Sequence, residues 1–139
     1  MRYVDTSVMI AYLIRETHSP VAEASMLSQG DQLAISTWSE VELLSALGIK
    51  LRTKQLTQQI ADGAIDIFRR SVSPHLHWIA VTDADHRQAA MLLDGWRSSL
   101  RAGDALHLAI ASARRATIYT LDRGMAAAGG LLGISVKLL

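Results

Sequence analysis

Four acidic side chains stand where carboxylates could carry out chemistry. Asp5 and Asp122 each follow a short apolar run, in the stretches YVDTS and YTLD. Glu42 and Asp104 lie within apolar sequence, in VELL and GDALH. A carboxylate near a core costs several kcal/mol or stays protonated unless a cation or good hydrogen-bond donors face it. One shared divalent cation, Mg²⁺ or Mn²⁺, would satisfy all four acids, because these ions prefer oxygen ligands.

Each of these acids also has an ordinary structural role open to it. Asp5 is equally suited to cap the helix that follows it, and Asp122 could cap a helix or lie in a turn. Asp104 could complement the dipole of a helix from its first turn. Glu42 could be a solvated helix residue, and Glu40 competes with it for the site. Residues two apart on a helix point about 200° away from one another, so only one of these glutamates can face the site.

The apolar pattern predicts short strands alternating with helices. The strands are expected at residues 3–4, 33–36, 77–81, 118–121 and 134–136. Helices are expected at 7–14, 19–29, 57–70, 82–93 and 125–128, and Ser19 is expected to cap the second of them. Another helix is expected to run from a cap at Thr37 or Ser39 to about residue 52, and a long one is expected after Gly103. Ser73-Pro74 is expected to break the chain.

Such an alternation is typical of an α/β protein with a mainly parallel sheet that helices cover on both faces. In such sheets ligands bind beyond the carboxyl ends of the strands. Asp5 and Asp122 are therefore expected at the same edge of the sheet, if their strands are parallel neighbours.

Length and composition predict one compact domain over residues 1–139, with 50% hydrophobic residues. The absence of cysteine excludes disulfide scaffolds, thiolate zinc sites and cysteine nucleophiles. The longest stretches without Asp, Glu, Lys or Arg, 124–136 and 71–82, are too short to span a bilayer. No secretory signal is visible, because Asp5 interrupts the place of an apolar segment. We therefore expect a soluble, cytoplasmic protein without a membrane partner.

The formal net charge of +1 first disfavours a nucleic-acid partner. Without the four candidate acids, however, 9 acidic side chains stand against 14 basic ones. This division describes an acidic pocket on a modestly basic body, which is compatible with nucleic acid.

Several other polar side chains have two readings. His107 follows Asp104 by three residues and could contact the site or a phosphate, or be a buried histidine bonded to a neighbour. His75 and His77 could form a zinc pair but lack further ligands.

Arg97 and Arg101 precede Asp104 and are candidates for contacts with backbone phosphates. The three tryptophans are interpreted as core or interface residues rather than as platforms for bases: Trp38, Trp78 and Trp96.

At these residues the sequence resembles the PIN-domain ribonucleases, and within them the VapC-type toxins of toxin–antitoxin pairs. The likeness covers nearly the whole chain, with YVDTS at 3–7, ELLSAL at 42–47, GDALHLA at 103–109 and TLD at 120–122. The resemblance implies a three-layer α/β/α fold. It also implies a metal site at the positions that match the family's acids: Asp5, Glu42, Asp104 and Asp122.

Two further positions follow from the same resemblance. Thr6 and Thr120 match positions that often carry a hydroxyl near the metal. Independently of the resemblance, His107 is a possible supporting residue because it follows Asp104 by three residues. Glu42 is preferred over Glu40 because it precedes the stretch LLSAL, as the family glutamate does.

The resemblance implies a Mg²⁺- or Mn²⁺-dependent endoribonuclease that leaves a 5′-phosphate and a 3′-hydroxyl, with tRNA or rRNA as the expected target. It further implies a cognate antitoxin that blocks the acidic pocket, a homodimer, and a toxin–antitoxin hetero-oligomer. A non-toxin RNA-processing nuclease and a non-catalytic interaction module with this fold remain alternatives. A haloacid-dehalogenase phosphatase would need an aspartate at position 7, where this sequence has serine.

Overall fold

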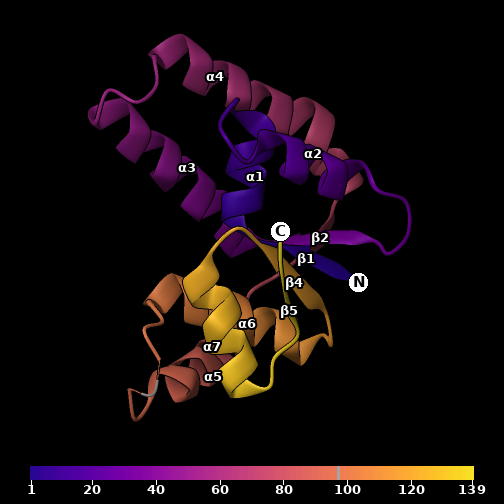
Figure 1. The fold of residues 1–139 in the computed structure, drawn as a ribbon, viewed down its shortest axis with the longest axis vertical. Coiled ribbons are helices and arrows are strands. Elements are labelled where there is room, and N and C mark those ends of the chain that lie inside the picture. Colours follow the sequence, from indigo (N-terminus) through magenta and orange to yellow (C-terminus); the bar gives the residue numbers. More distant parts are fainter. Residues whose placement is uncertain (97) are drawn as a thin grey trace.

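A computed structural model describes residues 1–96 and 98–139 (Figure 1). Five strands in these residues form one sheet: β1 (Arg2–Val4), β2 (Leu33–Ser36), β3 (His77–Ile79), β4 (Thr117–Thr120) and β5 (Val136–Leu138). All neighbouring strands are parallel, in the order β3-β2-β1-β4-β5. The helices are α1 (Thr6–Leu13), α2 (Ser19–Leu27), α3 (Thr37–Arg52), α4 (Gln58–Ile67), α5 (Asp83–Leu93), α6 (Ala102–Ala113) and α7 (Arg123–Leu132).

Helices cover both faces of the sheet. Successive strand residues point to opposite sides, so the apolar strands present side chains to be buried on both faces. Val4 and Ile35 belong to one apolar cluster, which includes residues of α1 to α4. Tyr3 and Ala34, one residue earlier on each strand, belong to a second cluster with α5, α6 and α7. Figure 1 shows α1 to α4 on one side of the sheet and α5 to α7 on the other. The three-layer α/β/α prediction is therefore confirmed, with a sheet that is parallel throughout.

The strand order reverses between β1 and β4. The chain passes from β1 to β2 and β3 on one side, and then returns to place β4 and β5 on the other. Tyr3 pairs with Ile118 and Val4 with Tyr119 in this register. Such a switch point is the usual place of a ligand site in parallel sheets, since the loops diverge there at the carboxyl ends of the strands. Asp5 and Asp122 follow these two strands.

Several helix boundaries differ from those predicted. Ser36, rather than Thr37 or Ser39, caps α3, and it exchanges bonds with Ser39 in a capping box. His18 precedes α2 without a side-chain cap bond, so Ser19 is the first helical residue and not the cap, and the helix ends at Leu27 rather than 29.

Other differences arise in the turns. The helix expected at 57–70 ends at Ile67 and continues as a π turn (Phe68–Val72) and a 3₁₀ turn (Ser73–His75). The chain therefore tightens at Ser73-Pro74 instead of breaking. Helix α7 exceeds the predicted 125–128, because Asp122 caps its start and Gly133, with φ +68°, ends it.

The predicted strand at 77–81 is shorter, since β3 ends at Ile79, and the last strand begins at Val136 rather than 134. Among the described residues, no helix combines the length and hydropathy that a membrane span requires.

A buried ion pair ties α5 to the end of α6. The side chain of Asp85 is 2% exposed, and it pairs with the Arg114 guanidinium, whose Nη2 lies 3.0 Å from Asp85 Oδ2. The same carboxylate accepts a bond from the Thr82 backbone nitrogen at 2.8 Å. Burial acts to raise the pKa of Asp85, but the bonds from Arg114 and Thr82 lower it to about 2.

The substitution Asp85→Asn should reduce the free energy of unfolding by about 2–3 kcal/mol near neutral pH. Because the folded-state pKa lies below the unfolded value, this stabilisation is complete above about pH 5 and is lost as the pH falls toward about 2. Urea denaturation at about pH 7 and about pH 3 measures the difference. Asp83→Asn, on the exposed first turn of the same helix, is the control and should cost less than about 1 kcal/mol. An equal difference at both pH values would contradict this account.

Candidate functional site

A cleft of about 310 Å³ opens beyond the carboxyl ends of β1 and β4. All four predicted acids border it: Asp5, Glu42, Asp104 and Asp122. Its remaining walls come from α1, α3 and α7, with the hydroxyl residues Thr6, Ser7 and Ser45 and the apolar side chains of Ile10, Ala46, Ile49 and Met125. The structure therefore brings together acids that are up to 117 positions apart in the sequence.

Asp5 fills both roles that the sequence left open. It caps α1 by accepting a bond from the Ser7 backbone nitrogen. Its Oδ2 also accepts bonds from the hydroxyls of Ser7, at 2.5 Å, and Thr120, at 2.8 Å. Its Oδ1 lies 3.7 Å from His107 Nε2. The side chain is 5% exposed, so these contacts fix the orientation of its carboxylate.

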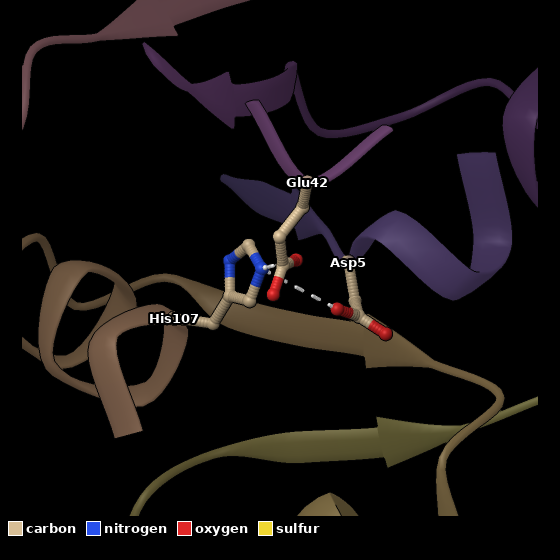
Figure 2. A group of neighbouring side chains, drawn as sticks. All are labelled: Asp5, Glu42 and His107. Atoms are coloured by element: carbon tan, nitrogen blue, oxygen red, sulfur yellow. Dashed lines mark hydrogen bonds and ion pairs between the residues drawn. The ribbon is translucent and has the colours of Figure 1, made fainter. Parts of the chain in front are cut away.

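Glu42 is held by two donors. Its Oε2 lies 2.6 Å from His107 Nε2 (Figure 2). The same oxygen lies 2.7 Å from the Thr6 hydroxyl. Burial acts to raise the pKa of Glu42, but the hydrogen bonds from His107 and Thr6 lower it overall. Glu40 lies instead 4.0 Å from the Arg69 guanidinium. The structure thus places Glu42, and not Glu40, in the cleft.

Asp104 and Asp122 each use one carboxylate oxygen at the start of a helix. Asp104 Oδ2 accepts a bond from the Arg101 backbone nitrogen at 3.1 Å, and Asp122 Oδ1 accepts one from Met125 at 2.9 Å. Burial raises the pKa of Asp104 despite the Arg101 bond, and the charges of Asp122, Asp5 and Glu42 raise it further. The raised pKa of Asp104 therefore reflects first its burial and then the negative charges around the cleft.

The two predicted threonines lie in the site. Thr6 donates to Glu42, as described above. Thr120 is buried in β4, where its hydroxyl donates to Asp5 and accepts a bond from the Asp122 backbone nitrogen at 2.9 Å. Thr120 therefore connects the acids that follow β1 and β4.

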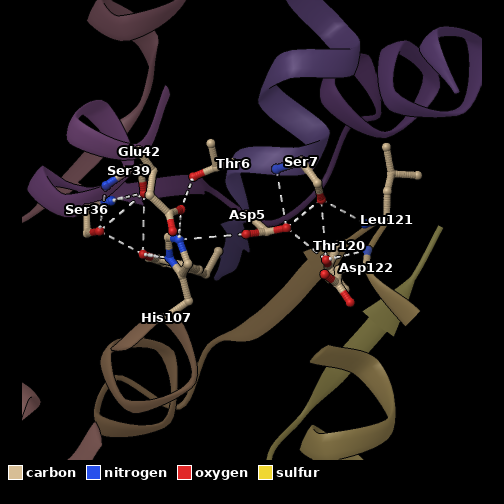
Figure 3. A network of polar contacts seen from close by, with 11 residues as sticks. Asp5, Thr6, Ser7, Ser36, Ser39, Glu42, His107, Thr120, Leu121 and Asp122 are labelled. Carbon is tan, nitrogen blue, oxygen red and sulfur yellow. Dashed lines mark hydrogen bonds and ion pairs between the residues drawn. The ribbon is translucent and has the colours of Figure 1, made fainter. Parts of the chain in front are cut away.

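Sequence reasoning missed a group of polar residues around the acids (Figure 3). Ser7 bonds Asp5 and accepts a bond from the Leu121 backbone nitrogen at 3.0 Å. Behind His107, the hydroxyl of Tyr3 lies among side chains of β2 and α3. Burial raises the pKa of this hydroxyl to about 12. The available signal for Ser7 was its place two residues after Asp5; nothing in the sequence pattern distinguished Tyr3 from an apolar core residue.

Of the remaining histidine and arginine candidates, His107 lies in the site. His107 is completely buried and bonds Glu42, so it is a buried histidine bonded to a neighbour and also contacts the site. His75 and His77 are exposed, and no group of three metal-binding side chains among the described residues includes them. Arg101 is exposed at the start of α6, whereas Arg97 lies outside the described residues.

The tryptophans differ from one another in their surroundings. Trp78 packs against Phe68 with ring centroids 6.2 Å apart, as expected of a core residue. Trp38 is partly buried and packs with the cluster that includes α6. Trp96 is 91% exposed, so the core role is excluded at this position and the predicted interface role stays a prediction.

The donor set fits a hard divalent cation. Ligand atoms of Asp5, Glu42 and His107 lie within 4.8 Å of one another. Carboxylate oxygens of Asp104 and Asp122 border the same cleft, and four carboxylates supply the oxygen donors that Mg²⁺ and Mn²⁺ prefer. A cation would also relieve the repulsion that raises the pKa of Asp104.

Solved structures share this fold across nearly the whole chain. FitAcB from Neisseria gonorrhoeae matches with a TM-score of 0.76 and 16% identity, covering 98% of this chain and 96% of that one. VapC20 from Mycobacterium tuberculosis, described as a sarcin-ricin loop cleaving toxin, matches with a TM-score of 0.73 and 20% identity, over 93% and 95% of the two chains. VapBC2 from Rickettsia felis, bound to a DNA fragment from its promoter, matches with a TM-score of 0.70 and 18% identity, over 99% and 98%.

The sequence itself identifies the family. A comparison with curated proteins finds no match. The family model for the PIN domain matches residues 2–131, which include all four acids of the cleft. This chain belongs to the PIN domain family.

Proposed function

We propose that this protein is a Mg²⁺- or Mn²⁺-dependent endoribonuclease that acts as the toxin of a toxin–antitoxin pair, with residues 1–139 as a single PIN domain. The observation that carries the proposal is the convergence of four carboxylates on one cleft, with Asp5 and Glu42 already fixed by hydrogen bonds. Membership of the PIN family supports it, and so does the shared fold with a toxin that cleaves the sarcin-ricin loop.

The carboxylates of Asp5, Asp104 and Asp122 would hold the cation directly or through water, and Glu42 would orient the attacking water or hold a second ion. When bound, the cation supplies a Lewis acid that polarises the phosphoryl oxygen and makes nearby water more acidic. Glu42 is suited to its role because the bonds from Thr6 and His107 orient its carboxylate, and its lowered pKa keeps the carboxylate ionised as a hydrogen-bond acceptor or ligand. The hydroxyls of Ser7 and Thr120 hold Asp5 in place before substrate arrives.

RNA fits the charge distribution around the cleft. Arg101 and Arg123 are exposed next to the first turns of α6 and α7, three residues before Asp104 and one after Asp122. Guanidinium groups there can bind backbone phosphates on either side of the scissile bond. Single-stranded loops of tRNA or rRNA are the substrates we expect, since their unstacked bases are accessible to a protein.

The partners we propose are a cognate antitoxin and a second copy of this chain, in the cytoplasm. The cleft joins an acidic floor to the apolar side chains of Ile10 and Ile49, which suits a peptide with an apolar face and a cationic residue. A toxin–antitoxin complex from Klebsiella pneumoniae has the same fold, with a TM-score of 0.63 and 19% identity over 91% of both chains.

The substitution Asp5→Asn should reduce RNA cleavage on the order of 100-fold or more, because it removes a charged ligand while the asparagine oxygen can still cap α1. Cleavage mapping on total RNA compares it with the wild type, with and without EDTA and then with added Mg²⁺ or Mn²⁺. Glu40→Gln is the matched control and should cleave like the wild type, since Glu40 faces Arg69. Full cleavage by Asp5→Asn would overturn the proposed mechanism.

The toxin assignment has its own test. Expression of the wild-type chain should arrest growth, and co-expression of the neighbouring small gene should restore it. Asp5→Asn at equal expression should not arrest growth. Normal growth together with cleavage in vitro would favour a housekeeping RNA-processing nuclease, and neither effect would favour a non-catalytic module.

Gly103 provides a test of how closely Glu42 must be placed. A Cβ atom on Gly103 would overlap Glu42 Oε1 and lie 3.7 Å from Trp38 Cζ2. Gly103→Ala should therefore displace the Glu42 carboxylate and reduce kcat on the order of 10- to 100-fold, because small misplacements of a catalytic group are costly. Steady-state cleavage and thermal unfolding measure the two effects, and the melting temperature should change little because only the end of a flexible side chain must move.

Gly63→Ala in α4 is the control for the glycine substitution. No atom lies within 4 Å of a Cβ atom at this position. The variant should keep wild-type cleavage and gain about 0.5–1 kcal/mol of stability. Wild-type cleavage by Gly103→Ala would show that the position of Glu42 is not critical.

A further inference from the structure

A chain of buried hydroxyl groups lies behind His107, on the side away from the cleft (Figure 3). The Tyr3 hydroxyl is 2.7 Å from His107 Nδ1 and 2.7 Å from Ser36 Oγ. It also lies 3.4 Å from Ser39 Oγ. Tyr3 and His107 are both 0% exposed, so neither side chain is in contact with bulk solvent. The network joins β1, the start of α3 and the middle of α6.

The contacts of His107 determine which of its nitrogens donates. Nε2 faces Glu42 Oε2 at 2.6 Å and Asp5 Oδ1 at 3.7 Å. Ionised carboxylates can only accept, so Nε2 must carry a hydrogen. Nδ1 faces the Tyr3 hydroxyl, which can donate to it. The short Nε2–Oε2 distance is typical of a hydrogen bond strengthened by the carboxylate charge.

The two oxygens of Glu42 are thereby distinguished. Oε2 accepts hydrogen bonds from both Thr6 and His107, and these two bonds use its two lone pairs. Oε1 borders Gly103, one residue before Asp104. His107 and Thr6 therefore leave the other oxygen of Glu42 directed toward the start of α6, next to Asp104.

We propose that His107 and Tyr3 are positioning residues of the nuclease: the Tyr3 hydroxyl holds the imidazole so that its Nε2 hydrogen fixes the Glu42 carboxylate, and Nε2 is not a metal ligand. This inference rests on the proposed function. In the alternative arrangement Nε2 binds the metal, because it lies close enough to Asp5 and Glu42 to complete a group of three ligands. The two arrangements exclude one another, since a nitrogen that bears a hydrogen cannot bind a metal.

The first experiment reads the histidine directly. In wild-type protein with ¹⁵N-labelled histidine, NMR should detect a hydrogen on Nε2 of His107, and pulsed EPR of the Mn²⁺-loaded protein should detect no directly bound imidazole nitrogen. A metal-bound nitrogen, or an Nε2 without hydrogen, would overturn the inference. These readouts do not require RNA cleavage. An inactive wild type would thus contradict the proposed function and leave this result standing.

The second experiment tests positioning through variants. Tyr3→Phe should lower kcat on the order of 10-fold with an unchanged KM for RNA. Loss of a residue that orients a site residue typically reduces activity by about 10- to 100-fold. Tyr12→Phe in α1 lies outside the network and should behave like the wild type. His107→Gln, which keeps a side-chain N–H, should retain more activity than His107→Ala. Equal losses in the two His107 variants, or wild-type kcat in Tyr3→Phe, would contradict the role.

Discussion

Four carboxylates around one cleft each require hydrogen-bond donors, because neighbouring like charges disfavour their ionised forms. Each acid is stabilised by donors on one of its oxygens: Asp5 by Ser7 and Thr120, Glu42 by Thr6 and His107, Asp104 by the Arg101 nitrogen, and Asp122 by the Met125 nitrogen. Helices that follow parallel strands begin at the same edge of the sheet, so their N-terminal dipoles favour negative charge there. Capping and ligand binding are therefore not competing roles in this fold, because one carboxylate can use different oxygens for each.

Two of the four acids, Asp5 and Asp122, could be predicted from the alternation of strands and helices, whereas Glu42 and Asp104 were chosen from their apolar surroundings and the family resemblance. A carboxylate at the end of a buried strand must lie at the carboxyl edge of the sheet, as Asp5 does. The choice of Glu42 over Glu40 followed from a family pattern, and the packing of α3 places them on different sides. Helical periodicity alone could not choose between the two glutamates. It fixes the angle between their side chains around the helix axis, but not which of the two side chains faces the cleft.

The parts that could not be predicted depend on contacts between distant residues. The bond between Tyr3 and His107 joins positions 104 apart, and no local pattern marks a strand tyrosine as its donor. The length of α7 was missed for a different reason. Its residues are mostly alanine and glycine, and its extent is set by the Asp122 cap and by Gly129 packing closely against Val136 of β5.

The place of β1 in the middle of the sheet has a consequence for how the cleft comes into being. β1 is made first, but its neighbour β4 and helix α6 come from residues beyond 101. A nascent chain that ends before α6 has Asp5 and Glu42 without Asp104, Asp122, Thr120 or His107. Contacts of such long sequence separation form late in folding. The cleft is thus completed only after synthesis has passed Asp122, and fragments that end before α6 carry two of its four acids.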